Sequence, residues 1–206
     1  MKTMVKTGGI IVLSGLLLAG CGNQAKASTP KTTGQPQLTR LTKQVRNLYA
    51  DSKYEMPAKQ LSEAALTKVK TQKDKVYRLR GDLSKAQLKT FKVDQQQLQS
   101  AKKIFSVQDT LNVELGKDQL LKDENFKIED FNNDFAYLLA HKAKFAASIK
   151  DKATLLDREV KAIALVKAAT TGDPDQTKID QARDAINAVD VKAFKDKYLS
   201  KIDDVN

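Results

Sequence analysis

Apolar side chains recur at every third or fourth position along most of this chain, which is the spacing of an amphipathic helix. A first helix, ending near Asp51, is predicted by Leu38, Leu41, Val45 and Leu48. The chain is rich in Ala, Leu, Lys and Gln, has only 6% aromatic residues and no Trp, and so favours helices over a sheet. We therefore expect an all-α fold.

The next two predicted helices form a hairpin. Pro57 suits the first turn of a helix that runs to about Arg80, and Gly81 can end this helix in the left-handed conformation. Its apolar stripe consists of Leu61, Ala65, Val69, Val76 and Leu79. Because the connection is short, we expect the following helix to return antiparallel to it.

Ser84 opens the third predicted helix, because Gln87 three positions later completes a capping-box pattern. The predicted core positions of this helix are Leu88, Phe91, Gln95, Leu98, Ala101 and Phe105. Apolar residues then alternate from Leu111 to Leu115, which fits either a short extended piece or the frayed end of the helix. We favour the helix end, because no partner strand is apparent. A packed connection follows, held by Leu120, Leu121, Phe126 and Ile128.

The longest stripe begins near Asp130 and keeps a near-heptad spacing to about Thr170. It consists of Phe131, Phe135, Leu138, Phe145, Ile149, Leu156, Ile163 and Val166. One uninterrupted helix of this length would extend for about 60 Å. Beyond it, Gly172 is the expected C-terminal cap, Asp173 the next N-cap and Pro174 the first residue of the next helix.

The last predicted helix is marked by Ile179, Ala182, Ile186, Val189, Ala193, Tyr198 and Ile202. Asp190 could restart it, but the stripe crosses that position in register, so we expect a continuous or mildly kinked helix. Together the segments predict an elongated antiparallel helical bundle with coiled-coil-like long hairpins. The length suits one folded domain, residues 38–206.

The first twenty residues have a different character. Lys2 and Lys6 precede an apolar run of about 13 residues, which is short for a membrane-spanning helix and typical of an export signal. The run ends in Leu18-Ala19-Gly20-Cys21, which resembles the lipobox of bacterial lipoproteins, and Cys21 is the only Cys of the chain. The alternative interpretation is an ordinary signal peptide, or a membrane helix, with a chance Cys.

The lipobox resemblance implies that Cys21 receives a diacylglyceryl group and palmitate, and that the chain is cut just before it. Residues 1–20 are then the cleaved signal peptide. Residues 21–37 are small, polar and interrupted by Pro and Gly, so we expect a flexible tether after the lipidated Cys21. The expected location is the extracytoplasmic face of the cell membrane.

The formal net charge of +11 is unevenly distributed. Residues 38–110 carry 16 Lys and Arg against 7 Asp and Glu, whereas residues 111–206 carry 16 against 18. Such basic residues either bind an anionic partner or form only the solvated face of two amphipathic helices, and the sequence leaves both interpretations open. The candidate anion-binding residues around the Gly81 turn are Lys68, Lys70, Lys73, Lys75, Arg78, Arg80, Lys85, Lys89 and Lys92.

Patterns typical of an enzyme or a metal site are weak. One His and one Cys are too few for a zinc site, and we expect neither a metal nor a cofactor. Asp130-Phe131-Asn132-Asn133-Asp134 imitates the start of a calcium loop, but Phe135 and His141 replace the Gly and Glu that such a loop requires. His141 has no catalytic partner at motif spacing, so we predict that the protein is not an enzyme.

The lipobox, the polar tether and the long helices resemble the cell-wall-binding lipoproteins of Gram-positive bacteria, most clearly at Leu61-Ser62-Glu63-Ala64-Ala65-Leu66 and Ile186-Asn187-Ala188-Val189. The resemblance implies location and shape. We expect a membrane-anchored protein that binds an anionic wall polymer, an anionic lipid or an envelope protein, and we expect no nucleic acid, because the export signal leads away from it. The alternative is a chaperone-like or accessory lipoprotein that clamps exported proteins between its helices. A solute-binding lipoprotein would need two α/β lobes, which the pattern does not indicate.

Overall fold

The computed structural model describes residues 34–172 and 175–204. These residues form seven α-helices and one 3₁₀ turn, and within them the only β-type pairings are two isolated bridges. The all-α prediction is therefore confirmed. The predicted signal peptide, residues 1–20, the expected lipidation site Cys21 and tether residues 22–33 lie outside the described residues.

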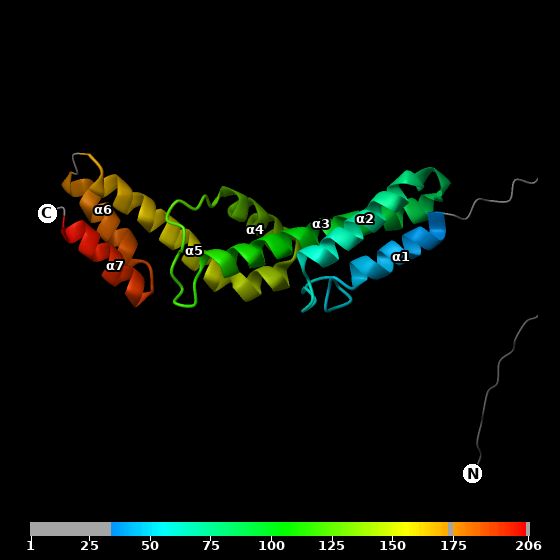
Figure 1. The fold of residues 1–206 in the computed structure, drawn as a ribbon, viewed down its shortest axis with the longest axis horizontal. Helices are drawn as coiled ribbons and strands as arrows, with labels where there is room; N and C mark the ends of the chain where they lie inside the picture. Colours follow the sequence, from blue (N-terminus) through cyan, green and yellow to red (C-terminus); the bar gives the residue numbers. More distant parts are fainter. Residues whose placement is uncertain (1–33, 173–174, 205–206) are drawn as a thin grey trace, which may run out of the picture. The chain divides into compact units, whose positions relative to one another are not determined.

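The first three helices pack on one another. They are α1 (Gly34–Arg46), α2 (Glu63–Arg78) and the first half of α3 (Lys85–Glu114), with the 3₁₀ turn η1 (Arg80–Asp82) joining α2 to α3. Figure 1 shows α2 and α3 side by side, as the predicted antiparallel hairpin requires. The fully buried residues between these helices include Leu41, Val45 and Val76.

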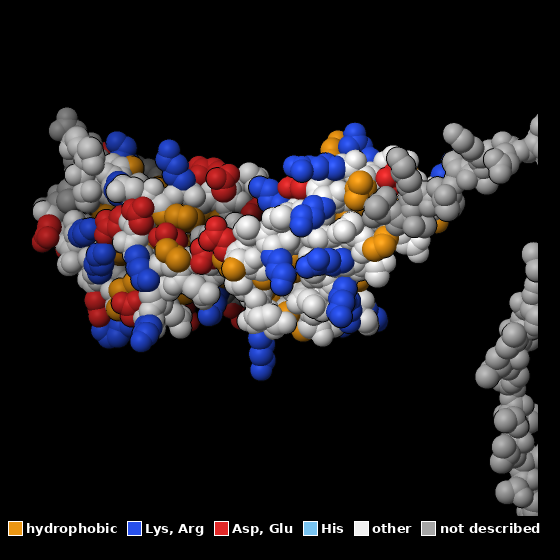
Figure 2. Space-filling model, turned by 45° about the vertical axis from the view of Figure 1, so that its right-hand side comes forward, with side chains coloured by type: hydrophobic (Ala, Val, Ile, Leu, Met, Phe, Trp, Pro, Cys, Tyr) orange, Lys and Arg blue, Asp and Glu red, His pale blue; other side chains and the backbone are white. Residues whose placement is uncertain are grey.

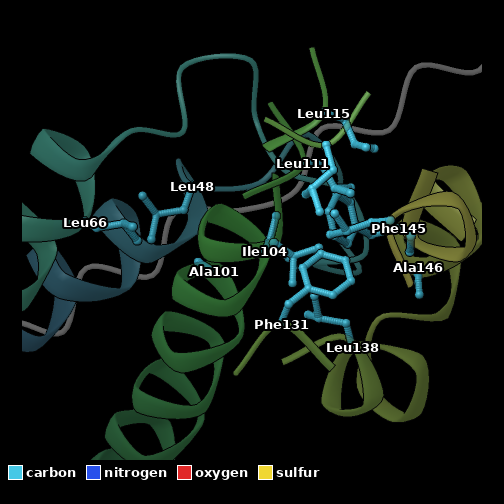
Figure 3. Close-up of a cluster of buried hydrophobic side chains, with 14 of the residues drawn as sticks. Leu48, Leu66, Ala101, Ile104, Leu111, Leu115, Phe131, Leu138, Phe145 and Ala146 are labelled. Atoms are coloured by element: carbon cyan, nitrogen blue, oxygen red, sulfur yellow. The ribbon is translucent and has the colours of Figure 1, made fainter. Parts of the chain in front are cut away.

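The second half of α3 packs against α4 (Glu129–His141), and both contact α5 (Ala143–Thr170). Figure 3 shows the side chains of Phe131, Leu138 and Phe145 gathered beside α3, whereas Leu48 and Leu66 lie on the other side of that helix. Thus α3 contributes to two successive cores. Its length of 30 residues, about 45 Å, makes this possible.

The second half of α5 forms a third group with α6 (Gln176–Asn187) and α7 (Lys192–Asp203). The core of this group includes Ile163, Ile186 and Phe194, all essentially inaccessible to solvent. The described unit is therefore a chain of three three-helix bundles, in which α3 and α5 are each shared by two bundles (Figure 1). The prediction of an elongated bundle with long helices is confirmed in this form.

The loop between α1 and α2 corrects two predicted boundaries. α1 ends at Arg46 and not near Asp51, and α2 begins at Glu63 and not at Pro57. The Asp51 carboxylate accepts hydrogen bonds from three backbone amides that follow it, so it closes a loop and does not end a helix. Pro57 lies in that loop, paired with Tyr49 in an isolated antiparallel bridge.

The first residues of α1 and α2 also differ from the predicted ones. α1 begins at Gly34, so the last four residues of the expected tether are helical and the folded unit starts before Leu38. The side chain of Ser62 caps α2 by accepting a hydrogen bond from the Ala65 amide.

The turn between α2 and α3 confirms one prediction and corrects another. Ser84 and Gln87 form the predicted capping box. Gly81 lies inside η1 with an ordinary negative φ, so it is not the expected left-handed cap. The chain turns through a tight 3₁₀ segment, which any residue can adopt.

The core stripe of α3 also differs in part from the prediction. Leu88 is 40% exposed, and the stripe runs through Asp94 and Ile104 in place of Gln95 and Phe105. The other predicted positions, Phe91, Leu98 and Ala101, are buried. α3 continues to Glu114, which confirms that the alternating residues belong to the helix end. In the connection that follows, Leu121 is buried and Leu120, Phe126 and Ile128 pack against the core as expected.

The longest predicted helix is broken at Lys142, between α4 and α5. This residue has φ −142° and ψ 55°, outside the helical region. It stands at the heptad position between Leu138 and Phe145, and its side chain is only 4% exposed. A buried lysine needs a polar partner, and Nζ donates to Gln97 Oε1 at 2.7 Å. The break and this hydrogen bond occur at the same residue.

The last predicted helix is also two helices, α6 and α7, with residues 188–191 between them. The break allows both helices to pack on α5, and it shifts the buried position from Ala193 to Phe194. Gly172 has the predicted left-handed conformation, with φ 77°. The side chain that caps α6 is that of Asp175, not Asp173; Asp173 and Pro174 lie outside the described residues.

Candidate anion-binding surface

The nine candidate basic residues lie on α2, η1 and the first turns of α3. All are exposed except Lys73, which is half-buried and pairs with Asp74 at 2.9 Å. This hydrogen bond from Lys73 lowers the pKa of Asp74. Among the described residues, no salt bridge involves the other eight, which are Lys68, Lys70, Lys75, Arg78, Arg80, Lys85, Lys89 and Lys92.

The helical spacing divides these residues into smaller groups. Lys85, Lys89 and Lys92 stand at positions i, i+4 and i+7 of α3 and therefore share one face. Lys68 and Lys70 stand near the start of α2, about 15 Å along the helix axis from Arg78. The structure thus brings together the residues around the turn, but it does not gather all nine into one cluster.

The surface charge differs between the α1–α3 part of the described unit and the rest of it. Figure 2 shows Lys and Arg side chains over the part formed by α1 to α3 with few acidic neighbours, whereas Asp and Glu are mixed with Lys over the opposite part. Exposed cations with few acidic neighbours attract phosphate or carboxylate groups over about a Debye length, roughly 8 Å in physiological salt. The α1–α3 part of the unit therefore has the chemistry of a polyanion-binding surface.

Two larger side chains near the turn are exposed with the cations. Tyr77 is 49% exposed, and the Arg80 guanidinium lies 3.9 Å from the centre of its ring. Arg80 also donates to the Tyr77 carbonyl at 2.9 Å. Leu88, in the first turn of α3, is the second exposed side chain. The turn therefore presents apolar groups among its cations.

A buried polar joint, which the sequence pattern did not indicate, connects the first and second bundles. Besides its hydrogen bond to Gln97, Lys142 Nζ lies 5.2 Å from the ring centre of Tyr49. The Tyr49 hydroxyl donates to the Gln97 carbonyl at 2.5 Å. Burial lowers the pKa of Lys142 and raises that of Tyr49. The sequence signal that could have indicated this joint is Lys142 itself, a lysine at a heptad position where an apolar residue is expected.

Glu159 is a second polar residue in the long stripe, and it is fully buried in α5. Oε2 accepts a hydrogen bond from the Leu121 amide at 2.7 Å, whereas Oε1 has no partner among the described residues. Burial raises the pKa of Glu159 to about 7. The hydrogen bond attaches the connection between α3 and α4 to α5.

Glu124 fixes the same connection to α7. Its carboxylate accepts from the Tyr198 hydroxyl at 2.7 Å and pairs with Lys197 at 2.8 Å and with Lys201 at 3.5 Å. The hydrogen bonds from Lys197 and Tyr198 lower the pKa of Glu124 to about 2. This cluster of one carboxylate and two ammonium groups holds its charges against one another and fixes the connection in place.

A hollow of about 650 Å³ lies between the end of α3, the following loop and α5. Leu111, Leu115 and Leu155 supply its apolar part, and the remaining lining is polar. The polar lining residues are Asn112, Gly116, Lys117, Gln119, Lys122, Asp151 and Lys152. Its charges are of both signs, with Lys117, Lys122 and Lys152 against Asp151.

The imitated calcium loop and the single histidine have structural partners. Asp134 pairs with Lys103, and the His141 ring lies 4.3 Å from that of Tyr137 at the end of α4. Within residues 34–172 and 175–204, no group of three His, Cys, Asp or Glu side chains could hold a metal ion. None of the helices in the same ranges is both long and apolar enough to cross a membrane.

Comparison of the chain with protein-family profiles, with curated proteins and with solved structures finds no match. Functional inference therefore depends on the sequence motif at Cys21 and on the geometry of the α1–α3 surface.

Proposed function

We propose that this protein is a non-enzymatic lipoprotein on the extracytoplasmic face of the cell membrane, anchored by lipid on Cys21. Its role is to bind an anionic component of the cell envelope through the basic surface of α2 and α3. The observation that carries the proposal is the group of exposed cations on these helices, eight of which form no salt bridge among the described residues. The partner supplies phosphate or carboxylate groups.

The alternative role, a clamp for exported proteins, would require a wide apolar groove. The hollow between the end of α3 and α5 has only Leu111, Leu115 and Leu155 as apolar lining residues, with charged residues beside them, and it is not a wide apolar groove. This observation gives the clamp no support, so the anion-binding role is preferred.

The anchor is tested by metabolic labelling with radioactive palmitate in a Gram-positive host that expresses the full chain. We expect label in the native chain and none in Cys21→Ala, because this is the only thiol available for the lipid. Equal labelling of both chains, or no labelling of either, would contradict the anchor.

The binding role is tested with residues 21–206 carrying Cys21→Ser, which lack lipid but retain the whole folded unit. We expect this protein to bind isolated cell envelopes at low salt and to be released as salt increases. Replacing Lys75, Arg78, Lys85 and Lys89 with Gln should weaken binding at least about tenfold, since each cation near an anionic surface contributes about 1 kcal/mol.

The matched control replaces Lys127, Lys144, Lys150 and Lys152 with Gln. These lysines are also exposed and form no salt bridge with a described residue, so the change in net charge is the same. Binding that falls equally in both variants would mean that net charge alone, and not this surface, is responsible.

A further inference from the structure

The end of the helical unit at the α2–α3 turn, residues Tyr77 to Lys89, is here named the hairpin tip. It carries the exposed cations Arg78, Arg80, Lys85 and Lys89 and only one acidic residue, Asp82. Because none of the four cations forms a salt bridge with a described residue, their charge is available to a partner.

The hairpin tip also exposes apolar groups between its cations. Tyr77 and Leu88 are 49% and 40% exposed. A tyrosine ring suits the boundary between lipid headgroups and acyl chains, because one end is apolar and the other accepts water or phosphate as a partner. Cations beside exposed aromatic and aliphatic groups are typical of segments that lie on anionic lipid. A soluble polyanion would not require the apolar pair.

The first residue of α1 lies against the hairpin tip. A Cβ on Gly34 would be 2.8 Å from Leu83 Cδ2 and 3.4 Å from the Leu79 carbonyl oxygen, so Gly34 is in direct contact with the turn. The chain that comes from Cys21 therefore joins the folded unit at this end. The opposite end of α3 is about 45 Å away along the helix axis.

Chain length then limits the distance between the anchor and the hairpin tip. Gly34 follows Cys21 by thirteen positions, and a polypeptide of that length spans at most about 45 Å in any conformation. Lipid on Cys21 would thus keep the hairpin tip close to the membrane and raise its effective concentration there.

We propose that the hairpin tip docks on the anionic lipid surface that holds Cys21, with Arg78, Arg80, Lys85 and Lys89 at the phosphates and Tyr77 and Leu88 in the headgroup layer. The inference rests on the proposed function for the lipid anchor. It specifies the anionic partner as membrane lipid. Docking at this end would direct α5, α6 and α7 away from the membrane.

Docking is tested by sedimentation with vesicles, using residues 21–206 with Cys21→Ser. One vesicle population is half phosphatidylglycerol and half phosphatidylcholine, and the other is phosphatidylcholine alone. We expect binding to the anionic vesicles only, with strong dependence on salt. Each cation near such a surface strengthens binding about fivefold, so Gln at the four cations of the hairpin tip should weaken it several hundredfold, about 600-fold. The variant with Gln at Lys127, Lys144, Lys150 and Lys152 is the charge-matched control and should change binding less than about threefold.

The apolar contribution has its own pair of variants. Tyr77→Ser with Leu88→Ser should weaken binding to anionic vesicles at least about fivefold at unchanged net charge, because the buried apolar area is lost. The control is Val113→Ser with Leu139→Ser, since these side chains are 50% and 51% exposed elsewhere on the unit. Circular dichroism should show that all variants remain folded.

The possible outcomes of these experiments test lipid docking and the proposed function separately. Docking on lipid is overturned if the hairpin-tip variants bind vesicles as the parent does, or if the control variants lose as much. It is also overturned if the four Gln substitutions abolish binding to lipid-free wall polymer but leave vesicle binding intact. In the last case the anion-binding role stands with a wall polymer as the partner. If the vesicle results are as expected but the full chain incorporates no palmitate, the anchor at Cys21 is refuted and binding of the hairpin tip to lipid stands.

Discussion

The carboxyl group of Glu159 lies in the core with one oxygen bonded to the Leu121 amide and the other without a partner among the described residues. Its pKa is raised by burial from the usual 4.5 to about 7. Between these values the folded protein binds a proton that the unfolded chain releases. The free energy of unfolding should therefore fall as pH rises through this window, by up to about 3 kcal/mol, and remain lower above it.

Substitution Glu159→Gln should remove this component of the pH dependence. The amide oxygen can still accept from Leu121 while carrying no charge, so the variant should lose less stability than the parent between pH 5 and pH 8. Urea unfolding at the two pH values measures the difference. Asp151→Asn, an exposed change on the same helix, is the control and should behave as the parent. Parallel pH profiles for parent and Glu159→Gln would contradict the assignment.

At the scale of elements, the Asp51 side chain closes the loop that follows α1. Three backbone amides donate to the Asp51 carboxylate, and the Asp51 carbonyl accepts from Arg46 at the end of α1. Burial alone would raise the pKa of Asp51, but these amide hydrogen bonds lower it overall. Loop closure by Asp51 supports the approach of α2 to α1.

Asp51→Ala should therefore lower the free energy of unfolding by about 1–2 kcal/mol, which is typical of losing hydrogen bonds to a charged acceptor. Chemical denaturation gives this value. Asp109→Ala, an exposed change on α3, should alter stability by less than about 0.5 kcal/mol. An Asp51→Ala variant as stable as the parent would show that the loop is held by other contacts.

At the scale of the whole helical unit, α3 and α5 connect the three bundles, because each of these helices belongs to two of them. Each passes without interruption from one core into the next, and the Lys142–Gln97–Tyr49 joint ties the first core to the second. Helices shared in this way cannot unfold in one bundle without weakening its neighbour. We therefore expect the unit to unfold cooperatively.

This expectation is tested with Ile186→Ala in α6, at a fully buried position where the loss of a large side chain costs about 2–5 kcal/mol. If the bundles are coupled, hydrogen exchange of the slowest amides in α2 should accelerate as well as exchange in α6. Ala164→Ser, an exposed change on α5, is the control. Faster exchange confined to α5, α6 and α7 would show that the bundles open separately.

The sequence by itself determined the helical class, the α2–α3 hairpin, the Ser84 capping box, the left-handed conformation of Gly172 and the positions of the basic residues, because each depends on neighbours within a few positions. The lipid anchor at Cys21 is also a local pattern and stays a prediction. What only the tertiary structure decided depends on distant partners. Lys142 breaks the long helix and bonds to Gln97 of α3, Asp51 binds its own loop, and Gly34 touches the turn at Leu83. That last contact joins the start of the folded chain to the hairpin tip. The sequence does not predict it, because a contact between residues nearly fifty positions apart leaves no periodic pattern in the sequence.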